Sequence, residues 1–314
     1  MAAEAMSVRA FAKTTALMLI SFATISFTTW AASPFPHALQ PAVTVPGGSM
    51  TVQSIQQGLP VVLAGPADVA LQASWAESAV NGIEARCVVP TDAAPGRYDL
   101  IVGEERREGA VWVLESIPAS YRIAFVSGHE PAGLVQAATA AVEAEALGLV
   151  FIGADADAAP YRAAARETTL PVWVTGVGDR SEWPFAFAAA IGQDTLLFHD
   201  PRVTKLGAGS GELHRLRRAT RASRWTIAVS PHYDPYIGIR NQLILFADDP
   251  VDMFVAPLDR IPETPEDLPV PGFWPRVRFE PIVAGAADAL LVVQFSSAPL
   301  RSARISVPSP PETP

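Results

Sequence analysis

The sequence predicts an all-β sandwich over residues 34–117 followed by an α/β domain over residues 118–307. In the first region, short alternating apolar runs recur at intervals of about ten residues between turn-forming residues, as in small β-sandwiches. In the second, three apolar runs alternate with Ala-rich segments of helical spacing, which predicts a buried parallel sheet. With 314 residues and 49% hydrophobic content, the chain is long enough to bury both cores.

The first 33 residues are typical of a targeting segment. Arg9 and Lys13 precede an apolar stretch over residues 14–32, and the small residues 31–33 offer a cleavage region. We therefore expect a cleaved signal peptide and an exported protein, periplasmic or extracellular. The alternative is a retained N-terminal anchor, because the apolar stretch is about long enough to span a bilayer.

The sandwich strands are expected at residues 42–45, 50–53, 61–64, 69–73, 83–89, 98–102 and 110–114. Residues 95–102 have the clearest pattern: a turn leads into a strand with Tyr98, Leu100 and Val102 on one face. Cys87 is expected to be a small buried hydrophobe of this sandwich rather than a reactive thiol. Because it is the single cysteine of the chain, an internal disulfide, a zinc finger and an iron–sulfur site are excluded.

The α/β region is expected to begin with strands at residues 121–127, 147–153 and 170–176, separated by helices. A hairpin around Gly192-Gln193, an Arg-rich helical segment and further strands follow. The later elements are expected as strands at 225–229 and 251–255, a helix at 237–248, a Pro-rich loop at 261–275, short strands between 277 and 307, and a disordered tail at 308–314.

Polar side chains follow the predicted strands at the points where the strands end. In order along the chain they are His129-Glu130, Asp155 and Asp157, Asp179-Arg180, His232 with Asp234, and Asp259. The carboxyl ends of parallel strands meet at one edge of a sheet, where ligands of such sheets bind. We therefore expect any functional site of this region to lie there.

This order of clusters resembles the calcineurin-like metallophosphoesterases over about residues 121–261. Residues 171–176, 224–232 and 251–256 resemble the family's strands that lead into its metal-binding motifs. The resemblance implies a four-layer α/β sandwich with a two-metal site at the strand ends. With the β-sandwich in front, the chain resembles secreted members that carry an immunoglobulin-like domain, as purple acid phosphatases do.

Several positions depart from the family's ligands. Its Asp-x-His reads Gly128-His129-Glu130 here, and Ala154 stands where the resemblance implies a metal-bridging carboxylate. Its Gly-Asn-His-Asp reads as residues 176–179, Gly-Val-Gly-Asp, and its Gly-His-x-His reads as residues 256–259, Ala-Pro-Leu-Asp. Two-metal chemistry needs hard oxygen and imidazole ligands that converge from several strands. Of the family's histidines, His232 is the one that this sequence retains.

We therefore expect a secreted metallophosphoesterase-fold protein that lacks the dinuclear chemistry, a pseudoenzyme with a binding or scaffolding role and no cofactor. The alternative is a phosphoester hydrolase with a remodelled site for a single divalent metal ion. A third possibility is an interaction module that acts through the β-sandwich. No catalytic residue is assigned, and the candidate metal ligands of the alternative are Glu130, Asp155, Asp157, Asp179, His232 and Asp259.

The net negative charge of the chain limits the classes of partner that it can bind. A formal charge of −9 and a pI near 5.1 oppose binding to nucleic acid and to anionic membranes. The expected partner is thus an unidentified protein or small molecule, with membrane contact only if the N-terminal segment is retained.

Ordinary structural roles compete with functional ones at several positions. Asp157 and Asp179 are suited to capping a helix or closing a turn, and Glu130 lies where a helix dipole favours an acidic group. His199-Asp200 is expected to mark a turn, whereas His232, in a rigid loop, is expected to line a pocket. Five arginines are expected to face solvent or a partner, with a phosphate site as the alternative, namely Arg215, Arg217, Arg218, Arg221 and Arg224.

Overall fold

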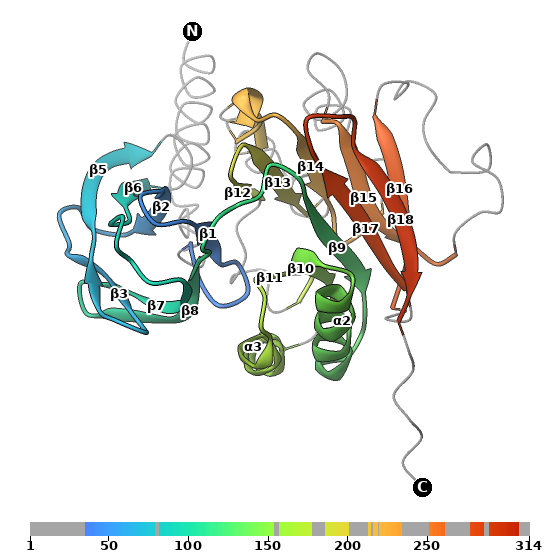
Figure 1. Ribbon diagram of the computed structural model, residues 1–314, viewed down its shortest axis with the longest axis horizontal. Helices are drawn as coiled ribbons and strands as arrows, with labels where there is room; N and C mark the ends of the chain where they lie inside the picture. The colour runs from blue at the N-terminus through green and yellow to red at the C-terminus, as the bar shows by residue number, and fades with distance from the viewer. Residues whose placement is uncertain are drawn as a thin grey trace, which may run out of the picture. The chain divides into compact units, whose positions relative to one another are not determined.

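A computed structural model describes residues 35–78, 82–153, 157–177, 186–200, 213–214, 216–218, 220–233, 251–260, 277–285 and 289–307 (Figure 1). All of them lie in one compact unit of the chain, residues 33–314. The predicted targeting segment, the helix at 237–248, the loop at 261–275 and the tail at 308–314 lie outside the described residues. No helix within the described ranges has the length and apolar character needed to cross a membrane.

Strands form at each place where the sequence predicts them before residue 118, and they make two sheets. The larger sheet has the order β1-β8-β7-β3-β4, with β1 (Ala42–Thr44), β8 (Glu105–Val113), β7 (Gly96–Val102), β3 (Val61–Ala64) and β4 (Val69–Ala70). The smaller has the order β2-β6-β5, with β2 (Ser49–Ser54), β6 (Gly82–Val88) and β5 (Gln72–Ser78). Apart from the parallel pair β1–β8, the paired strands run antiparallel.

Alternate residues of these strands fill the sandwich core, because successive side chains of a strand point to opposite faces. Val52, Leu63, Tyr98 and Leu100 are fully buried. Cys87 is buried among them, and burial raises the pKa of its thiol to about 11. The prediction of a buried cysteine is confirmed, and the raised thiol pKa disfavours the reactive thiolate.

The first α/β sheet has the order β11-β10-β9-β17-β18. Its strands are β9 (Tyr121–Ser127), β10 (Ala146–Ile152), β11 (Val172–Thr175), β17 (Ala289–Phe295) and β18 (Arg301–Ser306). The first three run parallel and are connected by α2 (Pro131–Glu143) and α3 (Ala158–Glu167), as the sequence predicts, whereas β17 runs antiparallel to β9 (Figure 1).

The second α/β sheet has the order β12-β13-β14-β15-β16. Its strands are β12 (Ala186–Ile191), β13 (Asp194–His199), β14 (Thr226–Val229), β15 (Met253–Leu258) and β16 (Arg278–Val283). The predicted hairpin is confirmed, since β12 and β13 pair antiparallel around Gly192, which has a φ of +61°. From β13 to β16 the strands run parallel, and a 3-10 turn, Thr220–Ala222, precedes β14.

The two α/β sheets pack face to face. Phe125 and Ile152 of the first sheet lie in one buried cluster with Phe198, Val229 and Val255 of the second. On the other face of the first sheet, Val126, Leu149 and Phe151 pack under Leu134 of α2 and Tyr161 of α3. The described chain is therefore a β-rich layered fold with mixed sheets. In β9 and β10, alternate side chains pack into two different hydrophobic cores, one on each face of the sheet.

Backbone and side-chain contacts connect the sandwich to the α/β region. Val174 of the edge strand β11 donates its N–H to the carbonyl of Leu39 at 2.8 Å, so the segment around Leu39 covers this edge strand of the first α/β sheet. The indole Nε1 of Trp173 donates to the carbonyl of Pro41 at 3.0 Å. Arg97 of β7 donates to the carbonyl of Ala165 at 3.1 Å, at the end of α3.

Candidate functional site

The carboxyl ends of the parallel strands lie along one edge of the two α/β sheets. In the first sheet, the N–H of Gly128 donates to Ile152 O at 3.0 Å, which extends the β9–β10 ladder past the end of β9. The N–H of Gly153 donates to Thr175 O at 2.8 Å in the same way. In the second sheet, Ser230 N donates to Val255 O at 3.0 Å. We refer to the described residues 128–130, 153, 157, 176–177, 230–232, 258–259 and 284–285 as the strand-end site.

Two glycines allow the strand ends of the site to approach one another closely. Gly176, which follows β11 of the first sheet, has a φ of +81°. A Cβ at this position would lie 2.9 Å from Cβ of Pro231, which follows β14 of the second sheet. Gly285 has a φ of +70°, its N–H donates to Ser127 Oγ at 3.1 Å, and a Cβ here would overlap the imidazole of His129. Only glycine combines the left-handed backbone with the space that these contacts leave.

Among the described residues, the candidate carboxylate ligands do not form a group at the strand-end site. Asp155 and Asp179 lie outside the described residues. Asp157 caps α3, because its Oδ1 accepts the N–H of Ala159 at 3.0 Å, so its predicted capping role is present. Glu130 occupies the N-cap position of α2 without a side-chain capping bond, and it is exposed, as is Asp259 after β15.

His232 lies in a loop held by Ser230. The hydroxyl of Ser230 donates to the carbonyl of His232 at 2.6 Å and accepts its N–H at 3.3 Å. The histidine is half-buried beside Pro231, which contacts the end of β11. Within the described ranges, no three His, Cys, Asp or Glu side chains are grouped closely enough to hold a metal ion.

Apolar packing fills part of the strand-end site. Val177 is 1% exposed, and one of its γ-methyls occupies the space that a Cβ on Gly153 would need. Pro257 and Leu258 are half-buried ladder residues of β15, paired with Ile282 and Val283. Chemically, the described part of this edge offers hydrophobic contact and backbone polar groups more than ligands for a cation.

His199 differs from its expected role as a turn marker. It is the last residue of β13 and is 2% exposed, because its side chain packs on the sheet face, where its ring stacks on Phe254 with centroids 5.9 Å apart. Neither ring nitrogen has a hydrogen-bond partner among the described residues. Burial lowers the pKa of His199 to about 4, against the opposing effect of the Asp200 carboxylate, so the imidazole is neutral near pH 7.

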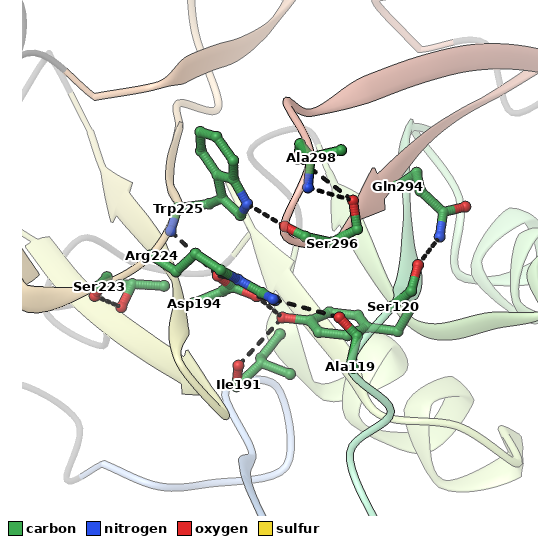
Figure 2. A network of polar contacts seen from close by, with 12 residues as sticks. Ala119, Ser120, Ile191, Asp194, Ser223, Arg224, Trp225, Gln294, Ser296 and Ala298 are labelled. Carbon is green, nitrogen blue, oxygen red and sulfur yellow. Dashed lines mark hydrogen bonds and ion pairs between the residues drawn. The ribbon is translucent and has the colours of Figure 1, made fainter.

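A buried polar network at the opposite edge of the sheets has no counterpart in the sequence predictions. Asp194, at the start of β13, is 1% exposed. Its carboxylate accepts Arg224 Nε at 3.0 Å and Nη2 at 2.5 Å, the N–H of Trp225 at 3.1 Å, and the Tyr121 hydroxyl at 2.7 Å. Figure 2 shows Arg224 extended alongside Asp194, with its guanidinium also reaching the carbonyl of Ala119. We call Tyr121, Asp194, Arg224 and Trp225 the strand-start network.

The strand-start network connects the two α/β sheets, because Tyr121 begins β9 whereas Asp194 and Trp225 lie at the starts of β13 and β14. Burial, followed by the hydrogen bond to Asp194, raises the pKa of the Tyr121 hydroxyl, and the hydrogen bond to Asp194 raises the pKa of Arg224. The expectation that Arg224 faces solvent or a partner is therefore wrong. Arg217 is buried, at 6% exposure, whereas Arg215 lies outside the described residues.

No protein-family model matches the chain, and no curated protein matches its sequence. Among solved structures, the chain has a similarity to the crystal structure of amylomaltase from Corynebacterium glutamicum, with 18% identity and a TM-score of 0.20. That similarity covers 37% of this chain and 21% of the amylomaltase chain. At such a TM-score it carries no inference about fold or function.

Proposed function

We propose that this chain is an exported protein that uses a metallophosphoesterase-like fold for binding or scaffolding rather than for catalysis. The observation that carries this proposal is the packing of the strand-end site. At positions where the resemblance implies metal ligands, the chain has Gly128, Val177 and Pro257, and the buried side chain of Val177 fills space beside Gly153.

The layering supports the fold assumed in this proposal. Two mixed sheets face one another, α2 and α3 cover the outer face of the first, and a two-sheet β-region precedes them. These features fit an immunoglobulin-like sandwich followed by a four-layer metallophosphoesterase-like sandwich. The strands that the resemblance rests on, β11, β14 and β15, all end at the same edge, as a site assembled from several strands requires.

The chemistry of two-metal catalysis explains why these positions matter. A dinuclear site needs a carboxylate that bridges two divalent ions and further ligands around each ion. Ala154 has no side-chain ligand for the bridging position. Asp157 is already used as the cap of α3, and Glu130 and Asp259 are exposed to water. A binding or scaffolding role does not need these ligands.

The proposal is tested with the purified full-length chain and an aryl phosphate, assayed with added manganese, zinc or iron. We expect no turnover above the chain-free reaction with any of these ions. Metal-dependent turnover with two bound ions per chain would contradict the proposal. Turnover with one bound ion, abolished by Asp179→Ala but not by Asp68→Ala in the sandwich, would favour the mononuclear hydrolase instead.

Export is tested separately in a bacterial host that expresses the chain with its own N-terminus. The chain is expected in the periplasm or the medium with a mass that lacks about the first 33 residues, because the small residues at 31–33 suit signal-peptide cleavage. An uncut chain in the membrane fraction would instead indicate a retained anchor.

A further inference from the structure

A pocket of about 490 Å³ lies next to the strand-start network, at the end of the second α/β sheet where β13 and β14 begin. The strand-end site lies at the opposite end of these strands. One wall is the β12–β13 hairpin, including Ala188, Ala190 and Thr195. The segment before β14 contributes Thr220, Ala222, Ser223 and Arg224, and Thr51 of β2 contributes from the sandwich. Its volume is in the range of small-molecule sites.

The pocket lies on the outer face of the second sheet and not in the core between the sheets. Phe187, Ala189 and Ile191 of β12 point into the inter-sheet core, so the alternate residues Ala188 and Ala190 point the other way. Ala190 is exposed. The hairpin therefore presents small side chains to the pocket, which leaves space for a ligand without a gap in the core.

Hydroxyl and amide groups give the pocket its polar character. Thr195 Oγ1 and Ser223 Oγ are 2.7 Å apart and share one hydrogen bond, in which either can be the donor. Each hydroxyl has one hydrogen and two lone pairs, so this pair retains a donor and several acceptor positions. Gln193 is exposed, and its side-chain amide makes no hydrogen bond to any residue that the structure describes. These groups both donate and accept.

The charges at the pocket wall cancel. Asp194 and Arg224 both line it, and they form an ion pair at 2.5 Å. The Arg224 guanidinium also donates to Ala119 O, so three of its five N–H donors are bound within the protein. Among the described arginines of this segment, Arg217, Arg218 and Arg221 do not line the pocket. Among the described residues that line the pocket, an anionic ligand would thus meet no uncompensated positive charge.

From this combination we infer that the pocket binds a neutral, hydroxyl-rich small molecule of the size of a monosaccharide or cyclic polyol. Ligand hydroxyls match the mixed donors and acceptors of Gln193, Thr195 and Ser223, and the alanine methyls of β12 contact the C–H faces of the ring. The pocket lies at the strand starts, so this inference does not depend on whether the strand-end site is catalytic.

The test is a titration of the full-length chain with glucose, mannose and myo-inositol as neutral probes and inorganic phosphate as the anionic probe, followed by calorimetry and ligand-observed NMR. We expect saturable binding of at least one neutral probe at millimolar concentration and none of phosphate. Ala190→Trp, which fills the pocket, should abolish that binding. Ser223→Ala should weaken it by about two- to tenfold, the effect of one neutral hydrogen bond.

Ala76→Trp provides the matched control, because Ala76 is an exposed strand residue of β5 in the sandwich. It should leave the affinity unchanged, and circular dichroism checks that each variant is folded. Saturable binding of phosphate alone, no saturable binding of any neutral probe, or binding that survives in a folded Ala190→Trp chain would each overturn the inference.

Discussion

Removing the carboxylate of Asp194 should destabilise the chain strongly. Asp194→Ala leaves the Tyr121 hydroxyl, which is largely buried, and the Arg224 guanidinium, whose side chain is 24% exposed, without their shared acceptor. Breaking a buried ion pair by removing one partner costs about 3–5 kcal/mol. Because water can solvate part of Arg224, we expect the lower end, about 3 kcal/mol of unfolding free energy. Asp194→Asn keeps the shape and one acceptor oxygen, and should cost less.

Urea unfolding followed by tryptophan fluorescence measures this loss as a lower midpoint. The matched control is Arg106→Ala, since Arg106 pairs with Asp99 at 2.6 Å on the sandwich surface with a side chain that is 60% exposed. Exposed pairs contribute about 0–1 kcal/mol. Equal midpoint shifts for Asp194→Ala and Arg106→Ala would refute the view that the strand-start network holds the two sheets together.

Three further changes test other parts of the fold. His199 has a pKa of about 4 in the folded chain, so between about pH 6.5 and 4 the unfolded chain binds more protons and stability falls as the pH is lowered. His199→Phe should reduce this slope by up to about 1.4 kcal/mol per pH unit, as measured by urea unfolding at several pH values. An unchanged slope would contradict the assignment. Asp157→Ala should lower the unfolding free energy by about 1 kcal/mol and Asp157→Asn by less, whereas equal losses would argue against capping. Gly285→Ala should lower the melting temperature, with partial recovery when His129→Ala is added, and a neutral Gly285→Ala would show that the close contact is not needed.

Local patterns were sufficient to predict most described elements. The centre of the run, residues 123–126, is apolar throughout because β9 is buried on both faces, by the second sheet and by α2. The hairpin was predictable because Gly192-Gln193 separates two apolar runs by two residues. Tyr98, Leu100 and Val102 were predictable as one face from the two-residue period of a strand.

Contacts between distant residues were not predictable from those patterns. Nothing in the apolar run of β17 indicates that it pairs antiparallel with β9, with Phe295 opposite Tyr121. The partners of Asp194 lie 73 residues before it and 30 residues after it, so an arginine expected to face solvent is in fact paired with a buried carboxylate. Periodicity specifies which face of an element is buried, but not which charged groups meet there.

The measurement that tests the central claim most directly is the metal content of the full-length chain after equilibrium dialysis against manganese, zinc or iron. The apolar packing of Val177 and the missing carboxylate at Ala154 predict no stoichiometric ion at the strand-end site. Two bound ions per chain, both lost in His232→Ala while Asp68→Ala retains them, would contradict the claim.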